Sequence, residues 1–272
     1  MADSRALGGS PDGVRRFRGL PSPLVALEFL TVLRLRRPPL VDSAALAAAQ
    51  AWYPLVGALI GGGLALVDRA LGGRLPPAPE AVVLLIVWEG TTGLLHLDGL
   101  ADCADGLLGL QPRERRLDIM RDSSVGSFGV AAVALYLLLA NAALGSLHGA
   151  ARGATLVAAP ALGRATMVAL AAALPYARAD GLGLGFQRAA RGWPGAIALV
   201  GALVLAVLCG GAGGLVLLGA ALTGAGVVGW LAWRRIGGLT GDVFGAACEL
   251  AQAGVLIAGI LLQGAGWFRP WL

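Results

Sequence analysis

Long apolar segments recur along the 272-residue chain and constrain its fold more than any other feature. A helix needs about 20 apolar residues to cross the hydrocarbon core of a bilayer. Because backbone polar groups in lipid must be paired internally, the pattern predicts an all-α, polytopic membrane helical bundle. About seven transmembrane helices are expected, the second and fifth being short: Ala51–Leu71, Ala81–Leu97, Val125–Leu147, Ala154–Leu174, Ala196–Gly210, Leu215–Trp233 and Val243–Leu262.

Composition supports a lipid environment. Hydrophobic residues make up 57% of the chain and charged residues only 14%. Soluble domains are typically about 45–50% apolar and about 25% charged, so a soluble globular protein is excluded. Glycine is frequent, with 43 residues, and much of it lies within apolar segments. Small residues let membrane helices approach closely, so these glycines are expected at helix contacts.

The chain divides into a short tail and one large domain. Residues 1–20 are rich in Gly, Ser, Pro and Arg, which predicts a flexible cytoplasmic tail. The apolar stretch Pro23–Leu35 is too short to span and predicts an interfacial or re-entrant helix. No linker or repeat divides the remainder, so residues 21–272 are interpreted as a single integral-membrane catalytic domain.

Arginines gather in alternate connections between the predicted spans. Loops on the cytoplasmic side of a membrane carry an excess of basic residues, so this side is predicted to be cytoplasmic. The net charge of +5 is therefore interpreted through topology, and no nucleic-acid partner is expected. The basic groups are Arg15, Arg16, Arg18, Arg34, Arg36 and Arg37; then Arg113, Arg115, Arg116 and Arg121; then Arg178, Arg188 and Arg191; and finally Arg234 and Arg235.

The most informative motif runs from His96 to Gly106 and contains three aspartates. Asp98, Asp102 and Asp105 are spaced i, i+4 and i+7, within an arc of roughly 60° on a helix. Three like charges on one face repel unless a cation neutralises them, and they are costly beside an apolar segment. Carboxylate oxygens suit a hard divalent ion, so the motif predicts a Mg²⁺ site.

A second acidic segment follows Pro112, which is expected to separate two helices. Asp118 and Asp122 are spaced i, i+4 and are expected to face the first three acids across a hairpin. Arginines between them suit phosphate binding, and the combination indicates phosphoryl transfer on a polyphosphate substrate. The alternative is a solvated, charge-balanced loop. The phosphate-binding candidates here are Arg113, Arg115, Arg116 and Arg121. His96 either orients a carboxylate or touches phosphate, or it is a structural residue at a helix end.

Three further segments are predicted on the same side of the membrane. The Ser/Gly turn after Asp122 either presents backbone N–H groups to phosphate or caps a helix, and Ser123 suits both roles. The loop Tyr176–Gly183 contributes Arg178 and Asp180, and the last span begins with Asp242 and carries Glu249. An intramembrane acid needs a partner, for which Arg164 in the fourth span is the natural candidate, although Arg164 would equally serve a substrate.

These segments closely resemble the cobalamin synthase family, also called adenosylcobinamide-GDP ribazoletransferases. The resemblance covers the chain from about Leu24 to Leu262 and departs from the usual family residues at Asp118, Ser124 and Leu239. It is carried by the runs HLDGLADCADG, RERRLDIMRDS, GSFG, YARADGLG and GGLTGDVFGAACEL.

The resemblance implies a Mg²⁺-dependent enzyme of the bacterial inner membrane with its active site on the cytoplasmic side. It would join adenosylcobinamide-GDP to α-ribazole, or to α-ribazole 5′-phosphate, and release GMP. Asp98, Asp102, Asp105 and Asp122 are then expected to bind metal, and Asp122 or Asp118 to accept the proton of the attacking alcohol. The expected substrate-binding residues are His96, Arg116, Arg121, Ser123, Arg164, Arg178, Asp242 and Glu249.

Two other functions compete with this interpretation. A lipid phosphotransferase of the CDP-alcohol type would share the metal and the bilayer but differ in its acceptor and nucleotide. A transporter would use Arg164 and Glu249 as an intramembrane ion path, but the acids cluster in a loop rather than at the midplane. A homo-oligomer is compatible with any of these functions.

Overall fold

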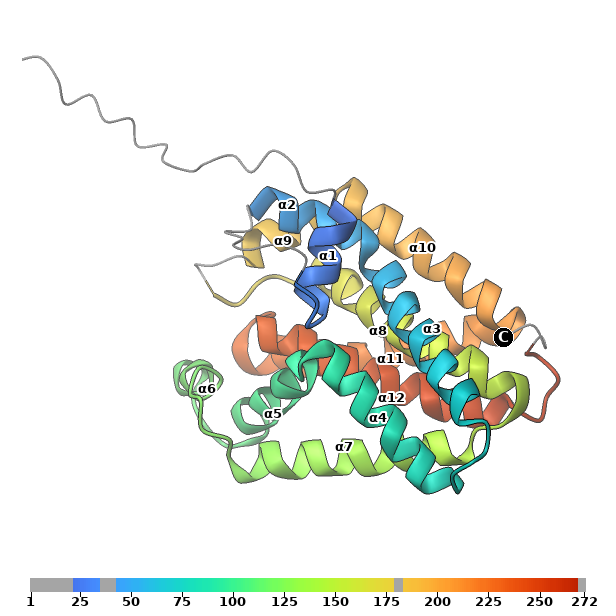
Figure 1. The fold of residues 1–272 in the computed structure, drawn as a ribbon. Coiled ribbons are helices and arrows are strands. Elements are labelled where there is room, and N and C mark those ends of the chain that lie inside the picture. Colours follow the sequence, from blue (N-terminus) through green and yellow to red (C-terminus); the bar gives the residue numbers. More distant parts are fainter. Residues whose placement is uncertain (1–21, 35–42, 179–182, 269–272) are drawn as a thin grey trace, which may run out of the picture.

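Residues 22–34, 43–178 and 183–268 are described by the computed structural model. The predicted tail over 1–20 and Asp180 lie outside the described residues. Within these residues the fold is helical, and its only extended pairing is a single bridge between Tyr176 and Leu239 (Figure 1). The elements are α1 (Ser22–Leu30), α2 (Ser43–Ala49), the 3₁₀ helix η1 (Gln50–Trp52), α3 (Tyr53–Leu71), α4 (Pro77–Thr92), α5 (Leu95–Leu108), α6 (Arg113–Ile119), α7 (Ser127–Ser146), α8 (Gly149–Ala173), α9 (Gly183–Ala190), α10 (Trp193–Gly210), α11 (Ala212–Ile236) and α12 (Gly241–Leu262).

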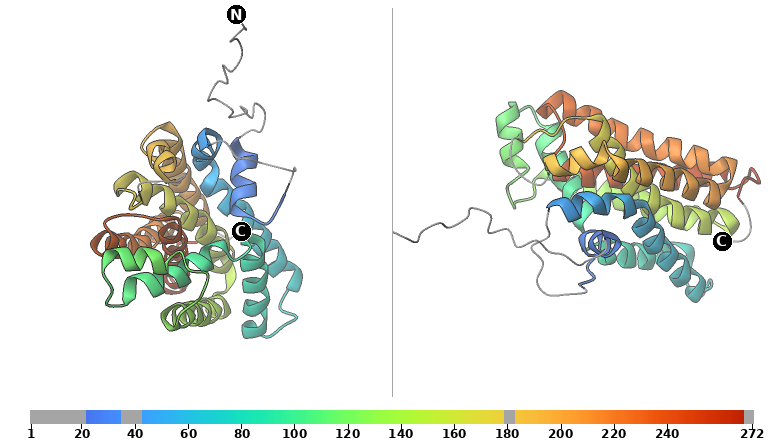
Figure 2. Two further views of the ribbon diagram at one scale, coloured as in Figure 1. Left: turned by 90° about the vertical axis from the view of Figure 1, so that its left-hand side faces the viewer. Right: turned by 90° about the horizontal axis from the view of Figure 1, so that it is seen from above.

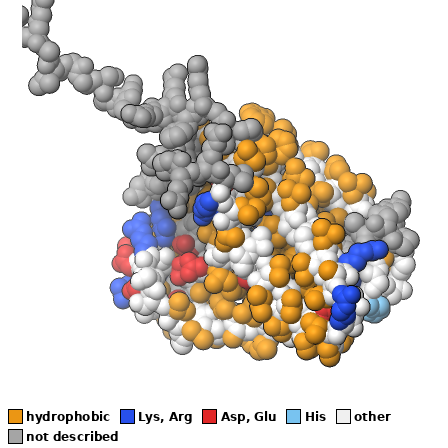
Figure 3. Space-filling view, viewed as in Figure 1, with side chains coloured by type: hydrophobic (Ala, Val, Ile, Leu, Met, Phe, Trp, Pro, Cys, Tyr) orange, Lys and Arg blue, Asp and Glu red, His pale blue; other side chains and the backbone are white. Residues whose placement is uncertain are grey.

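Six helical segments in the described part are long and apolar enough to cross a membrane. They are Ala44–Leu71, which joins α2, η1 and α3, together with α7, α8, α10, α11 and α12. Large apolar side chains such as Leu135, Leu138 and Val200 are more than 60% exposed. Figure 3 shows hydrophobic side chains spread over the visible face. The predicted polytopic bundle is confirmed, and its outer surface suits lipid tails.

The second span was predicted to end at Leu97, but the helix that contains its start ends five residues earlier, at a sharp bend. Helix α4 stops at Thr92, and α5 leaves it at an angle of 90°. Gly93 and Leu94 both adopt left-handed backbone conformations, with φ of 64° and 62°. Glycine tolerates this conformation, whereas it is costly for leucine, so tertiary packing holds the bend. The apolar pattern continues through the bend and therefore gave no sign of it.

The described short helices lie at one end of the bundle. Figure 1 places α2, α5, α6 and α9 toward the left, and the connections α3–α4, α7–α8 and α10–α11 at the other end. The further views in Figure 2 agree with this division. Helix α1 (Ser22–Leu30) confirms a short helix in the region predicted over Pro23–Leu35, and its interfacial or re-entrant position stays a prediction. The motifs singled out in the sequence therefore gather at the end that carries α5 and α6.

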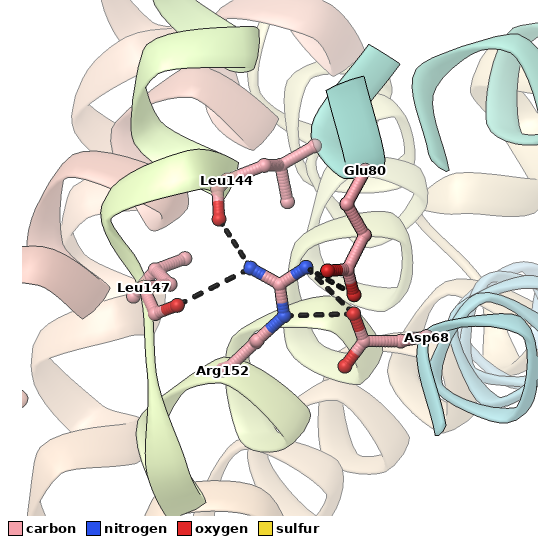
Figure 4. Close-up of polar contacts among 5 residues, drawn as sticks. All are labelled: Asp68, Glu80, Leu144, Leu147 and Arg152. Atoms are coloured by element: carbon pink, nitrogen blue, oxygen red, sulfur yellow. Dashed lines mark hydrogen bonds and ion pairs between the residues drawn. The ribbon is translucent and has the colours of Figure 1, made fainter. Parts of the chain in front are cut away.

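The opposite end is held together by Arg152 at the start of α8 (Figure 4). Its guanidinium pairs with Asp68 of α3 at 2.6 Å and with Glu80 of α4 at 3.3 Å. It also donates hydrogen bonds to the carbonyls of Leu144 and Leu147, where α7 ends. One cation thus joins four helices.

Close helix contacts use glycine, as predicted. A Cβ atom on Gly57 of α3 would lie 2.6 Å from the Cα atom of Ala161 in α8. Such a distance is far inside van der Waals contact, so only glycine permits this crossing. Small residues at helix interfaces are the usual means by which membrane helices pack.

Candidate active site

The acidic motif lies on α5, directly after the bend. The helix spans Leu95–Leu108, so the predicted helical spacing of Asp98, Asp102 and Asp105 is confirmed. Asp98 is exposed, whereas Asp102 and Asp105 are half-buried. Asp98 lies in the first helical turn, where the helix dipole favours a negative charge. The three acids nevertheless have different surroundings.

Helix α12 brings a fourth carboxylate to this site. Asp242 interacts electrostatically with Asp98 and Asp102, and it lines the same cavity as Asp98. The two helices cross closely, because a Cβ atom on Gly99 would lie only 2.7 Å from the carbonyl oxygen of Asp242. Gly245 on α12 faces the same crossing. The glycines in both motifs thus permit the approach that unites Asp98, Asp102 and Asp242.

Arg178 supplies a positive charge to this group. Its Nη2 atom lies 3.3 Å from Oδ2 of Asp242. The loop before Arg178 is anchored to the segment before α12, since Ala177 N donates to Leu239 O and Leu239 N to Pro175 O, both at 2.8 Å. Thr240 caps α12 by accepting a hydrogen bond from Val243 N. Asp242 therefore lies in the first turn of α12, and Thr240 is the N-cap.

Asp105 turns away toward α7. Its Oδ2 atom accepts a hydrogen bond from Gly126 N at 2.7 Å, and its Oδ1 atom accepts one from Gly129 N at 2.9 Å. These donors belong to the unpaired N–H groups at the start of a helix. A side chain at Gly129 would collide with this carboxylate, at 2.4 Å. Asp105 therefore fixes α7 to α5.

Ser123 does not cap α7. The N-cap position is Gly126, and the helix-end N–H groups are satisfied by Asp105 instead. Ser123 itself is exposed in the turn that precedes α7. The capping alternative from the sequence is wrong, and its phosphate-binding role stays a prediction.

The second acidic pair is not on one helix. Asp118 lies on α6, which ends at Ile119, whereas Asp122 follows in a turn. Asp122 accepts a hydrogen bond from Ser124 N at 2.9 Å. Hydrogen bonds from Ser124 hold the pKa of Asp122 below its usual value, because they favour the ionised carboxylate. Asp118, Asp122 and Arg121 are all exposed.

Arg116 serves the fold rather than an open surface. It is buried, and its Nη1 atom donates to the carbonyls of Gly106 and Leu107 at 2.9 and 2.8 Å. Its Nη2 atom donates to Gly109 O at 2.7 Å. Burial lowers the pKa of Arg116, but the group stays charged at neutral pH. Since these bonds close the end of α5, the expectation of a phosphate clamp is wrong for Arg116.

Arg164 and Glu249 lie deep in the bundle and are connected through Gln252. Arg164 donates to Gln252 Oε1, and Gln252 Nε2 donates to Glu249 Oε2 at 2.7 Å. Gln252 Nε2 also lies 3.4 Å from the hydroxyl of Tyr136 on α7. The predicted Arg164–Glu249 partnership is thus indirect. Gln252 was missed, although its place three residues after Glu249 in an apolar span is a readable signal.

His96 is buried at the foot of α5 and lines the cavity that contains Asp98 and Asp242. Neither ring nitrogen has a hydrogen-bond partner among the described residues. The imidazole therefore lines the same cavity as the two acids but forms no hydrogen bond with either of them.

The described residues contain no group of three or more His, Cys, Asp or Glu side chains arranged to hold a metal ion. Asp98, Asp102 and Asp242 nevertheless offer oxygen ligands from adjoining helices. Mg²⁺ keeps several waters and commonly takes only one or two carboxylates from a protein. The donor set therefore fits hydrated Mg²⁺ better than a fully caged ion.

Comparison with known proteins identifies the family. A family model described as cobalamin-5-phosphate synthase matches residues 22–260. An adenosylcobinamide-GDP ribazoletransferase of Pseudomonas paraeruginosa (strain DSM 24068 / PA7) is 42% identical over 88% of this chain and 97% of its own length. Similarly named proteins of Chlorobaculum tepidum, with 90% and 97% coverage, and Roseiflexus sp. (strain RS-1), with 84% of both chains, are each 40% identical.

No solved structure matches the chain. The family match over residues 22–260 nevertheless includes the acidic motif on α5, the loop before Arg178 and the start of α12. The chain belongs to the cobalamin-5-phosphate synthase family of enzymes.

Proposed function

We propose that this protein joins adenosylcobinamide-GDP to α-ribazole, or to its 5′-phosphate, in a Mg²⁺-dependent reaction that releases GMP. The names of its relatives supply the substrates. The observation that carries the proposal is the meeting of Asp98, Asp102 and Asp242 beside Arg178 at one end of the bundle. Carboxylates outnumber the basic side chains in this group, so a divalent cation would be attracted to it. The bound cation would in turn attract a polyphosphate.

The reaction is an in-line displacement at phosphorus. A ring hydroxyl of the ribose attacks, because the 5′ oxygen already carries a phosphate when α-ribazole 5′-phosphate is the acceptor. The oxygen of this hydroxyl forms a bond to the phosphorus next to the cobinamide, while the bond from that phosphorus to the GMP oxygen breaks. A proton leaves the attacking hydroxyl, and GMP departs as an anion. Positioning and charge stabilisation provide most of the catalysis in such transfers.

The acids on α5 and α12 would hold the metal. Asp98 and Asp102 are the principal ligands in this proposal, with Asp242 as a further oxygen donor. Bound Mg²⁺ would neutralise the developing charge on the pyrophosphate. Asp105 contributes by holding α7 in place, since both its oxygens accept backbone hydrogen bonds.

The remaining groups act on the substrate. Arg178 reaches the phosphate side of the site while it holds Asp242, and Arg121 on the exposed turn contributes a second guanidinium. Asp122 takes the proton of the attacking alcohol, because its carboxylate is exposed in the turn between α6 and α7 and can accept a proton there. Asp118 is the second candidate for this role.

We place the active site on the cytoplasmic side of the bacterial inner membrane. The connections at this end contain arginines on α6, on α9 and at the end of α11. The connections at the other end contain fewer arginines, and Arg152 there forms ion pairs with Asp68 and Glu80. An excess of basic residues marks the cytoplasmic face.

Purified protein in lipid vesicles tests the function. Adenosylcobinamide-GDP and α-ribazole should yield equal amounts of GMP and adenosylcobalamin with Mg²⁺, and neither product with EDTA. A parallel reaction with α-ribazole 5′-phosphate identifies the preferred acceptor. Release of CMP from CDP-diacylglycerol, with no GMP from the corrinoid, would instead support the lipid phosphotransferase.

A further inference from the structure

A cavity of about 280 Å³ opens beside Asp98 and Asp242. Small-molecule pockets are typically ~300–1,000 Å³, so this cavity suits one compact group and not a corrinoid macrocycle. Apart from the two carboxylates and His96, its walls are mostly apolar and aromatic. The lining comprises Phe29, Leu46, Leu95, His96, Asp98, Gly99, Met167, Tyr176, Phe186, Gly241, Asp242, Phe244 and Gly245.

Phenylalanine and tyrosine rings are concentrated around this cavity. The chain contains only six phenylalanines and three tyrosines. Four of these nine residues line the cavity, and a fifth, Tyr53, stacks on Phe29 with ring centroids 6.2 Å apart. Lipid contact does not explain the cluster, because Phe186 and Phe244 are less than 10% exposed.

The rings form a continuous row that helices from distant parts of the chain hold in place. Tyr53 of α3 lies 5.8 Å from Phe186 of α9, which lies 5.0 Å from Phe244 of α12. The buried Gln50 side chain donates to Phe186 O at 2.7 Å and so fixes the backbone that carries this ring. A fixed aromatic wall favours a flat aromatic ligand, because stacking then requires little reordering.

One polar group within the cavity wall has no partner. His96 is 1% exposed, and both of its ring nitrogens lack hydrogen bonds among the described residues. A buried polar atom without a partner is costly, unless a ligand supplies one. The imidazole can donate one hydrogen bond to a ring nitrogen of a bound heterocycle.

We infer that this cavity binds the benzimidazole base of the ribazole acceptor. This inference rests on the proposed function for the identity of the acceptor. Once joined to ribose, the base retains a single ring nitrogen as an acceptor. Among the described side chains that line the cavity, His96 is the one with buried ring nitrogens that lack a partner, and it can supply the matching donor. Guanine could donate to the two carboxylates, but it also has several acceptors along its edges, and the mostly apolar walls would leave most of these acceptors unpaired. With the base inside, the attached ribose would extend from the cavity toward Asp98 and Asp242.

Kinetics of the two substrates test the inference with Phe186→Leu and Phe244→Leu. Loss of a stacking ring should raise the KM for α-ribazole about tenfold. The KM for adenosylcobinamide-GDP should change less than about twofold, because the corrinoid lies outside the cavity. Phe268→Leu is the matched control, since Phe268 packs near Gly210 at the other end of the bundle and should change neither constant. A rise confined to the KM of adenosylcobinamide-GDP would overturn the inference.

Direct binding of α-ribazole, followed by its benzimidazole fluorescence, separates this inference from the proposed function. Wild-type protein should bind it, and the two cavity variants should bind about tenfold more weakly, even in a preparation without turnover. If the wild type turns over and both variants bind ribazole as tightly as the wild type does, the inference is wrong but the proposed function holds. If ribazole binding depends on Phe186 and Phe244 but no GMP is released, the cavity assignment holds and the proposed function is wrong.

The imidazole has its own test. Ribosylindole lacks the ring-nitrogen acceptor and should bind wild-type protein about fivefold more weakly than α-ribazole, the effect of one hydrogen bond. In His96→Leu the two ligands should bind equally. Discrimination that persists in His96→Leu would show that the imidazole does not contact the base.

Discussion

Charge is balanced differently at the two ends of this bundle. At the α3–α4 end, Asp68 and Glu80 share Arg152, and all three side chains are less than 20% exposed (Figure 4). At the α5–α12 end, Arg178 pairs with Asp242, while Asp98 and Asp102 add further negative charge around it. Both clusters combine acids with one arginine, but only the first is arranged as a closed set of short contacts.

The difference separates a structural role from a binding role. A half-buried arginine with two acids and two carbonyls leaves little capacity for a ligand, so the Arg152 cluster joins helices. Acids that repel one another persist where a cation or substrate compensates them. The same residue types therefore stabilise the fold at one end and prepare a binding site at the other.

The largest effect is expected for Asp102→Asn. Removing a metal-binding carboxylate should reduce turnover by at least about 10³-fold, because a bound metal contributes several kcal/mol to transition-state stabilisation. GMP release measures turnover, and size-exclusion chromatography in detergent checks folding. Asp68→Asn, which removes an acid at the other end, should retain activity. Near-normal activity of Asp102→Asn would contradict a binding role for the acids at the α5–α12 end.

A large loss of stability is expected for Arg152→Met. Two half-enclosed acids would lose their cation, and breaking a buried ion pair in this way costs roughly 3 kcal/mol. The free energy of unfolding in mixed detergent micelles measures the effect, while turnover per folded molecule should be unchanged. The triple variant Arg152→Met, Asp68→Asn, Glu80→Gln should recover much of the stability. If Arg152→Met lost activity without unfolding more easily, the cluster would not be merely structural.

An intermediate effect is expected at Asp105, which belongs to the site by sequence but to the fold by its contacts. Asp105→Ala removes two hydrogen bonds to the start of α7 and should lower the free energy of unfolding by about 2 kcal/mol. Asp105→Asn keeps one acceptor oxygen and should lose about half as much. Thermal unfolding and GMP release are measured together. Abolished turnover at wild-type stability in Asp105→Asn would instead make Asp105 a metal ligand.

The smallest effect is expected at Asp118. This residue is exposed on α6, whereas Asp122 lies in the turn that leads to α7. Asp118→Asn should change turnover less than about threefold, while Asp122→Asn should reduce it by about 10²-fold through loss of the general base. Single-turnover rates of GMP release at saturating substrate compare the two. The reverse order would assign the base to Asp118.

Local features of the fold could be predicted from the sequence because their signals are local. Apolar length predicted the spanning helices, and the spacing of Asp98, Asp102 and Asp105 predicted one helix. The break at Gly93 and Leu94 was missed because hydropathy does not change there. Arg116 was misassigned because charge alone does not reveal that its partners are the carbonyls at the end of α5.

Hydrophobic length and helical period are properties of short segments, so the residue pattern alone specifies a membrane bundle with an acidic helix at one end. Which charges meet depends instead on how distant segments pack. The tertiary structure brings Asp242 to Asp98 and Asp102, and it joins Asp68 and Glu80 to Arg152. The physical reason is that partner choice depends on where helices cross, and these crossings are set by packing between residues far apart in the chain.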